Sequence, residues 1–151
     1  MTRLWEIIIL GKCRGLRAQY DRKDSITMII QCREKDREML LAFLEEDAEY
    51  NAPVIRELES CSFDEKQHLV YAEVEKEECA GVYLCSCGSR NLMISCREHC
   101  VNVDFLEQFF GMYLPDTVTG KPDDVRVAGW LLTDYEMTVS DGRAVLSAGK
   151  A

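Results

Sequence analysis

Apolar residues recur at helical spacing in two segments of the chain. The first covers residues 36–50, and Asn51 supplies a suitable stop signal after it. The second begins near Asn102 or Asp104, where Asp104 and Glu107 have the spacing of a capping box. The apolar positions of the first segment are Leu40, Phe43, Leu44 and Ala48, and those of the second are Phe105, Leu106, Phe109, Phe110 and Tyr113. The pattern predicts two amphipathic helices.

Runs typical of strands outnumber these helices. They cover residues 4–10, 26–32, 54–63, 68–74, 82–87, 92–96 and 125–134. A last hairpin turns at Asp141-Gly142, a strong two-residue turn signal, and pairs Val139 with Ala144. The same register sets Met137 opposite Leu146 and Tyr135 opposite Ala148. Consecutive hairpins predict an α+β fold: a single domain over residues 1–151, with a mostly antiparallel sheet and two amphipathic helices on one side.

The expected core draws on both kinds of element. Its predicted members are Ile7, Ile9, Ile29, Leu40, Leu44, Cys85, Ile94, Phe105, Phe109 and Trp130. A chain of 151 residues, 47% of them hydrophobic, suits one such core. The longest apolar run, residues 39–44, is far shorter than the roughly 20 residues of a membrane span. The N-terminal apolar run breaks at Gly11 without a cleavage site, so we expect a cytoplasmic protein.

The net charge of -9 is concentrated in the middle of the chain. Residues 1–33 carry +4, residues 34–78 carry -10 and residues 79–151 carry -3. Four carboxylates fall in the last turns of the first predicted helix, where each costs about 0.3 to 1 kcal/mol against the helix dipole. They are Glu45, Glu46, Asp47 and Glu49, and Glu57 and Glu59 lie in the next segment. Local stability does not explain them, and the alternative to a functional surface is a solvated acidic face.

The sequence therefore predicts a non-enzymatic protein-binding domain with no cofactor. Its partner would be a protein with a basic surface, docked on Glu45, Glu46, Asp47, Glu49, Glu57 and Glu59. The most specific form is an inhibitor that mimics phosphates and occupies a nucleic-acid-binding surface, as antirestriction and anti-CRISPR proteins of mobile elements do. Direct nucleic-acid binding is disfavoured by the acidic charge, although the basic loop of residues 12–23 leaves it open. That loop contains Lys12, Arg14, Arg17, Arg22 and Lys23.

The cysteines support a second interpretation. The chain has 8 of them, and Cys85, Cys87, Cys96 and Cys100 form two close pairs separated by a short hairpin. This segment loosely resembles a zinc ribbon, which implies a small zinc-stabilised regulatory module in which His99 could replace Cys100. Packing is the competing explanation, because pairing Cys87 with Leu92 places the cysteines on one apolar face.

Catalytic signatures are weak. A thiol nucleophile needs a base, and the proximity of His99 to Cys100 in sequence does not establish a side-chain contact. The segment Thr119-Gly120-Lys121 lacks the upstream glycine of a phosphate loop and is followed by Pro122. We therefore expect no enzyme activity.

Overall fold

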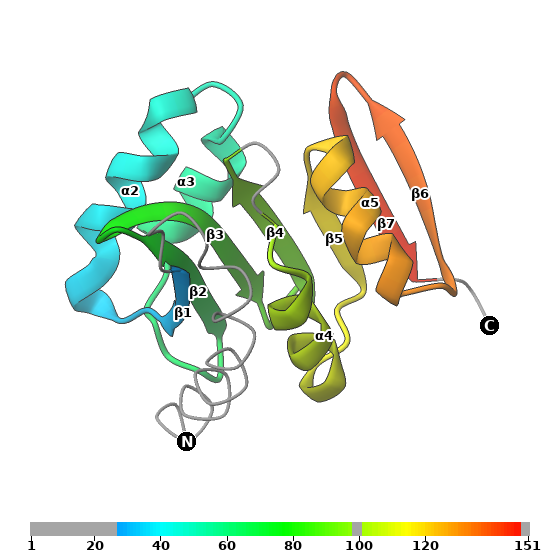
Figure 1. Cartoon of the computed structure of the whole chain (residues 1–151), viewed down its shortest axis with the longest axis horizontal. Helices are drawn as coiled ribbons and strands as arrows, with labels where there is room; N and C mark the ends of the chain where they lie inside the picture. The colour runs from blue at the N-terminus through cyan, green and yellow to red at the C-terminus, as the bar shows by residue number, and fades with distance from the viewer. Residues whose placement is uncertain (1–26, 98–100, 149–151) are drawn as a thin grey trace.

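The computed structural model describes residues 27–97 and 101–148 of the chain (Figure 1). Its elements, in chain order, are β1 (Thr27–Gln31), η1 (Glu34–Asp36), α2 (Arg37–Leu44), η2 (Glu45–Asp47), α3 (Ala52–Glu59), β2 (His68–Glu75), β3 (Glu78–Ser86), β4 (Asn91–Cys96), α4 (Val103–Met112), β5 (Thr117–Gly120), α5 (Pro122–Leu131), β6 (Tyr135–Ser140) and β7 (Arg143–Ala148). The predicted α+β class with a mostly antiparallel sheet is confirmed. The predicted strand at residues 4–10, with Ile7 and Ile9, lies outside the described residues.

The strands form one seven-stranded sheet in the order β1-β2-β3-β4-β5-β7-β6. Neighbouring strands are antiparallel except β4 and β5, which run parallel. A parallel pair needs a crossover, and α4 provides it. The sheet therefore has one internal junction where two adjacent strands end on the same side of the molecule.

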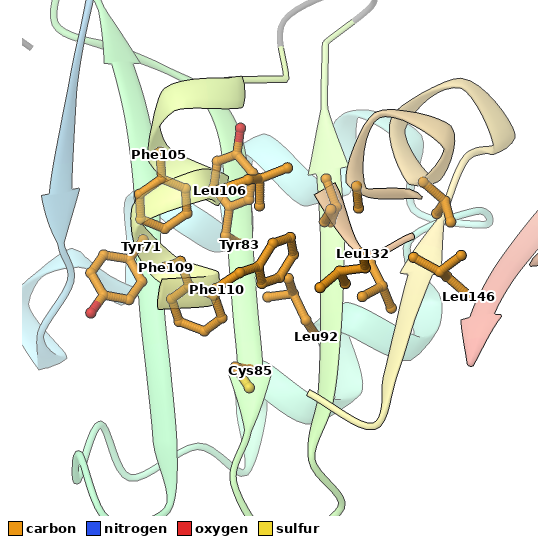
Figure 2. Packing of buried hydrophobic residues seen from close by; sticks show 14 of the residues in the cluster. Tyr71, Tyr83, Cys85, Leu92, Phe105, Leu106, Phe109, Phe110, Leu132 and Leu146 are labelled. Atoms are coloured by element: carbon orange, nitrogen blue, oxygen red, sulfur yellow. The ribbon is translucent and has the colours of Figure 1, made fainter. Parts of the chain in front are cut away.

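Helices cover both faces of the sheet rather than one. On one face α2 and α3 pack against alternate residues of β2 and β3, such as Val70, Ala72 and Leu84. On the other, α4 and α5 cover a second apolar layer that includes Tyr83 and Leu146 (Figure 2). The aromatic rings of this layer stack closely: Tyr71 and Phe105 lie 5.0 Å apart between centroids, Tyr83 and Phe105 4.8 Å, and Phe105 and Phe109 5.8 Å. The sequence predicted two amphipathic helices on one side of the sheet, whereas the structure has α2 and α3 on one face and α4 and α5 on the other.

Two segments predicted as strands are helices. Residues 54–63 fall mostly in α3, which buries Val54 and Leu58 at a spacing of one helical turn. Residues 125–134 fall mostly in α5, which buries Val125 and Ala128. Trp130, expected in the core, lies on the outer side of α5 and is 65% exposed. The other described core predictions are buried: Ile29, Leu40, Leu44, Cys85, Ile94, Phe105 and Phe109.

In the β6–β7 and β3–β4 hairpins the side chains lie on the faces of the sheet that the sequence predicted. The β6–β7 hairpin has the predicted register, with Val139 opposite Ala144, and its turn residues Asp141 and Gly142 have positive φ. In the β3–β4 hairpin Cys85 pairs with Leu92, which is two residues from the expected register. A shift of two preserves the face of every side chain. The predicted packing of Cys85 and Cys96 in one apolar layer is therefore confirmed. Within the described ranges no helix is long and apolar enough to cross a membrane.

Candidate functional site

A pocket of about 490 Å³ lies at the carboxyl ends of the parallel strands β4 and β5. Its lining residues are Tyr50, Cys96, Lys121, Pro122, Asp123, Asp124 and Gly142. Figure 1 shows the segment between α2 and α3, the tips of β4 and β5, and the β6–β7 turn on the same side of the molecule. Open sheets commonly bind ligands outside the carboxyl ends of parallel strands. A volume of this size suits a small molecule.

The two parallel strands stay paired over a short distance. Their ladder contains three pairs, the last joining Met93 to Thr119. Gly120 then passes so close to β4 that a Cβ there would lie 2.7 Å from the Ile94 carbonyl oxygen. The ladder to β5 ends at Met93, whereas β4 itself continues to Cys96, which lines the pocket.

Tyr50 forms one wall of the pocket and is held by its neighbours. Arg143 donates from Nη2 to the Tyr50 carbonyl oxygen at 2.5 Å, and its guanidinium carbon lies 4.1 Å from the ring centroid. Lys121 Nζ lies 5.6 Å from the same centroid. Among the described residues the buried Tyr50 hydroxyl has no hydrogen-bond partner. Burial raises the pKa of Tyr50, with Asp124 and Asp47 nearby, so this hydroxyl keeps its proton at neutral pH.

The first turn of α5 also lines the pocket. Pro122 occupies one of its first positions, where a missing N–H costs nothing. Asp124 is 5% exposed, whereas Asp123 is exposed and pairs with Arg126 at 3.0 Å. The pocket thus combines a buried carboxylate, a protonated phenol and two cations near one ring. Such a set can bind a polar molecule and accept a proton from it.

A second polar group lies behind Cys96 in the layer under α4. Gly81 pairs with both Glu73 and Cys96, and a Cβ on Gly81 would lie 2.7 Å from the Cys96 thiol sulfur. The Tyr83 hydroxyl accepts a hydrogen bond from the Asn102 N–H at 2.9 Å, and it points toward the start of α4 (Figure 2). Burial raises the pKa of Glu73 to about 7, and a hydrogen bond from the Asn102 side chain opposes this effect by lowering the pKa. This group is enclosed, and we do not include it in the site.

The structure places the predicted acidic residues on an exposed turn and on α3. The predicted helix ends at Leu44, so Glu45, Glu46 and Asp47 form η2, between the end of α2 and the start of α3. Glu46 lies 4.0 Å from Arg97, and Glu49 and Glu59 are exposed. Glu57 contacts His68 at 2.8 Å. Binding of a basic protein partner by these residues stays a prediction.

The predicted zinc ligands do not come together. Cys85 and Cys96 lie four residues apart along the β3–β4 ladder, which is about 13 Å. Zinc bonds of about 2.3 Å hold sulfurs within about 4 Å of each other, so one ion cannot bind both. Cys87 lies beyond the end of β3, and no group of three or more His, Cys, Asp or Glu side chains in the described ranges could hold a metal. Cys100, His99 and the basic loop of residues 12–23 lie outside the described residues.

The pocket residues were missed because they come from three distant segments. Tyr50, Asp124 and Gly142 share no spacing that a motif could reveal. In the sequence Lys121 was considered only as part of a phosphate loop, and the segment Thr119-Gly120-Lys121 did not fit that motif. The available signal was Pro122, which with the spacing of Val125 and Ala128 indicates the start of a helix directly after a short strand.

A scan against known protein families gives no match, and a search of curated proteins gives none. Two solved structures share part of the arrangement. The aminoglycoside N-acetyltransferase AAC(6')-Ib11 is 13% identical at a TM-score of 0.43, over 82% of this chain and 96% of that one. The N-acetyltransferase PseH of Campylobacter jejuni, in complex with acetyl coenzyme A, is 8% identical at a TM-score of 0.38, over 83% of this chain and 100% of that one.

These findings contradict part of the functional interpretation. Both similar structures are enzymes, and one binds acetyl coenzyme A. The predictions of a non-enzymatic domain, of an inhibitor that mimics nucleic acid and of a chain without a cofactor are corrected accordingly and are not carried forward. The match does not assign the neighbours' activities to this chain.

Proposed function

We propose that this protein is an enzyme that transfers an acyl group to an amine, with the pocket at the ends of β4 and β5 as the acceptor site. The observation that carries the proposal is the pocket itself, with Tyr50 and Asp124 both in its lining. An acceptor amine is protonated at neutral pH and must lose a proton before it attacks a carbonyl carbon. Asp124 is the group that accepts this proton, and the Tyr50 hydroxyl donates a hydrogen bond to the bound acceptor.

Acetyl coenzyme A is the donor to test first, because it is bound in one of the two similar structures. In the transfer the amine nitrogen bonds to the thioester carbonyl carbon, the carbon–sulfur bond breaks, and coenzyme A leaves as a thiolate that takes up a proton from solvent. The cytosol is the compartment we propose, because thiols stay reduced there, and the six described cysteines form no disulfide with one another.

An acyl-transfer assay tests the proposal. The purified protein is incubated with acetyl coenzyme A and a panel of primary amines, and acylated product is measured by mass spectrometry. Asp124→Asn should lower kcat by about a hundredfold or more, as loss of a general base does. The matched control is Asp134→Asn, because Asp134 is exposed and is not among the residues that line the pocket; its kcat should stay near that of the wild type.

Absence of product with every amine would refute the proposal. An Asp124→Asn protein with an unchanged kcat would remove Asp124 from its assigned role. Circular dichroism of each variant checks that the fold is intact.

A further inference from the structure

Two cations beside the pocket have no carboxylate partner among the described residues. In residues 79–97 and 101–148 the chain has five lysines and arginines. Three of them form ion pairs: Arg90 with Asp116 at 3.2 Å, Arg97 with Glu78 at 3.9 Å, and Arg126 with Asp123 at 3.0 Å. The other two, Lys121 and Arg143, form none with described carboxylates. Other cations of the described ranges, such as Lys66 and Lys76, also form none, so what distinguishes Lys121 and Arg143 is their place beside Tyr50 and the pocket.

Both of these cations lie against the ring of Tyr50. Arg143 is 4.1 Å and Lys121 5.6 Å from the ring centroid, and both side chains are half-buried. The hydrogen bond from Arg143 to the Tyr50 carbonyl oxygen uses Nη2, and a guanidinium carries five N–H donors. Donors therefore remain on Arg143, and the Lys121 ammonium is a compact charge with three more.

Asp124 gives the same pocket a negative wall. It is 5% exposed and lines the pocket together with Lys121, three residues earlier in the chain. Lys121 and Asp124 thus place both signs in the lining of one concave space, and Arg143 lies beside it against the Tyr50 ring. A ligand with a single charge would meet one wall of like sign, whereas a zwitterion would match both.

We infer that the acceptor carries an anionic group, a carboxylate or a phosphate, close to its amine, and that Lys121 and Arg143 bind this anion beside Tyr50. The part of this inference that concerns the amine rests on the proposed function, in which Asp124 accepts the proton of the amine. The part that concerns the anion rests on the two cations alone. The substrate class is therefore an amino acid or an amine phosphate rather than a simple amine or a polyamine.

Isothermal titration calorimetry without any acyl donor tests the anion half separately. The probes are two matched pairs: phenylalanine against phenylalaninamide, and O-phosphoethanolamine against ethanolamine. In each pair the second molecule keeps the amine and lacks the anion. We expect the wild-type protein to bind the anionic member of one pair at least about tenfold more tightly, the effect of one hydrogen bond between charged groups. The pair that shows the preference identifies carboxylate or phosphate.

Lys121→Gln should reduce that preference about tenfold, and Lys121→Arg should retain most of it. Lys121 is the N-cap residue of α5 but makes no side-chain cap hydrogen bond, so both variants should fold. The control is Lys66→Gln, on an exposed turn before β2, which should leave the preference unchanged.

Equal affinity within both pairs, or no binding of any probe, would overturn the inference. So would a Lys121→Gln protein that discriminates as the wild type does. Acyl transfer without a preference for anionic acceptors would refute this inference and still support the proposed function. A preference for anionic probes without any acyl transfer would support this inference and refute the proposed function.

Discussion

Glu73 is a carboxyl group inside an apolar layer. It is 7% exposed on β2, and burial raises its pKa from 4.5 to about 7. Between these pH values the unfolded chain has released the proton and the folded chain still holds it. The folded state therefore binds more protons, so the free energy of unfolding falls as pH rises from about 4.5 to about 7. The pKa difference corresponds to on the order of 3 kcal/mol.

Glu73→Gln should remove this pH dependence. Glutamine keeps the shape of the side chain and cannot ionise, so the variant should be more stable than the wild type at pH 8 and similar to it at pH 4.5. Urea unfolding at a series of pH values measures the difference. Glu136→Gln, at an exposed position on β6, is the control and should follow the wild type. An equal loss of stability with pH in Glu73→Gln would show that another group is responsible.

The residues of the candidate site could not be predicted from the sequence, because their role depends on the fold that brings them together. The positions of Tyr50 and Asp124 matter because the fold brings the end of η2 beside the start of α5. Sequence spacing contains no such information. The acidic run of residues 45–49 was conspicuous in sequence, yet it lies in η2 and the turn after it rather than in the last turns of α2.

The helix α4 shows how one residue sets the start of an element. The Asn102 side chain accepts a hydrogen bond from the Phe105 N–H at 2.9 Å and is the N-cap of α4. The expected capping box of Asp104 and Glu107 is not formed, because Asp104 already lies in the first turn. There it contributes through its charge at the positive end of the helix dipole.

Asn102→Ala should therefore cost more stability than Asp104→Ala. Loss of the cap costs about 1 kcal/mol, within a range of roughly 0.5 to 2, whereas loss of the charge costs about 0.3 to 1. Asn102→Ser, which keeps a capping oxygen, should recover part of the loss. Denaturant unfolding at pH 7 measures all three variants. A larger effect at Asp104 would mean that the predicted capping box governs the helix after all.

Elements with a strong local signal were predicted well. The β6–β7 hairpin has its turn residues at Asp141-Gly142, and α4 has a wide apolar stripe. The helices α3 and α5 were mistaken for strands because both are short and rich in β-branched residues such as Val54 and Val125. Both begin with a proline in the first turn, and tertiary packing of apolar residues spaced four apart in α3 and three apart in α5 outweighed strand propensity.

The whole sheet is joined at a single parallel junction. Strands β1 to β4 form an antiparallel block, β5 to β7 form another, and the three pairs between β4 and β5 connect them. The fold class followed from the number of hairpins, but this junction did not, because β5 has only four residues and no strand was predicted there. At the junction Gly120 has no room for a Cβ, which would lie 2.7 Å from the Ile94 carbonyl oxygen.

Gly120→Ala should loosen this junction and destabilise the protein by about 1 to 3 kcal/mol, because the added Cβ would lie 2.7 Å from a backbone oxygen that must move. Gly129→Ala on α5 is the matched control. Its Cβ would meet Leu146 at 3.7 Å, an ordinary contact, and alanine in a helix interior gains up to about 1 kcal/mol. Urea unfolding should give opposite signs for the two variants. Equal signs would show that close approach at the junction does not limit stability.

The two apolar layers differ in which part of the chain completes them. Every residue of the layer under α2 and α3 comes from residues 30–93, whereas the layer under α4 and α5 also needs residues up to 146. During translation the first layer can close as soon as β4 has left the ribosome, with α4, β5 and α5 still to be made. The nascent sheet then exposes its other face until the second half arrives. The pocket, which needs Gly142, is among the last parts of the protein to form.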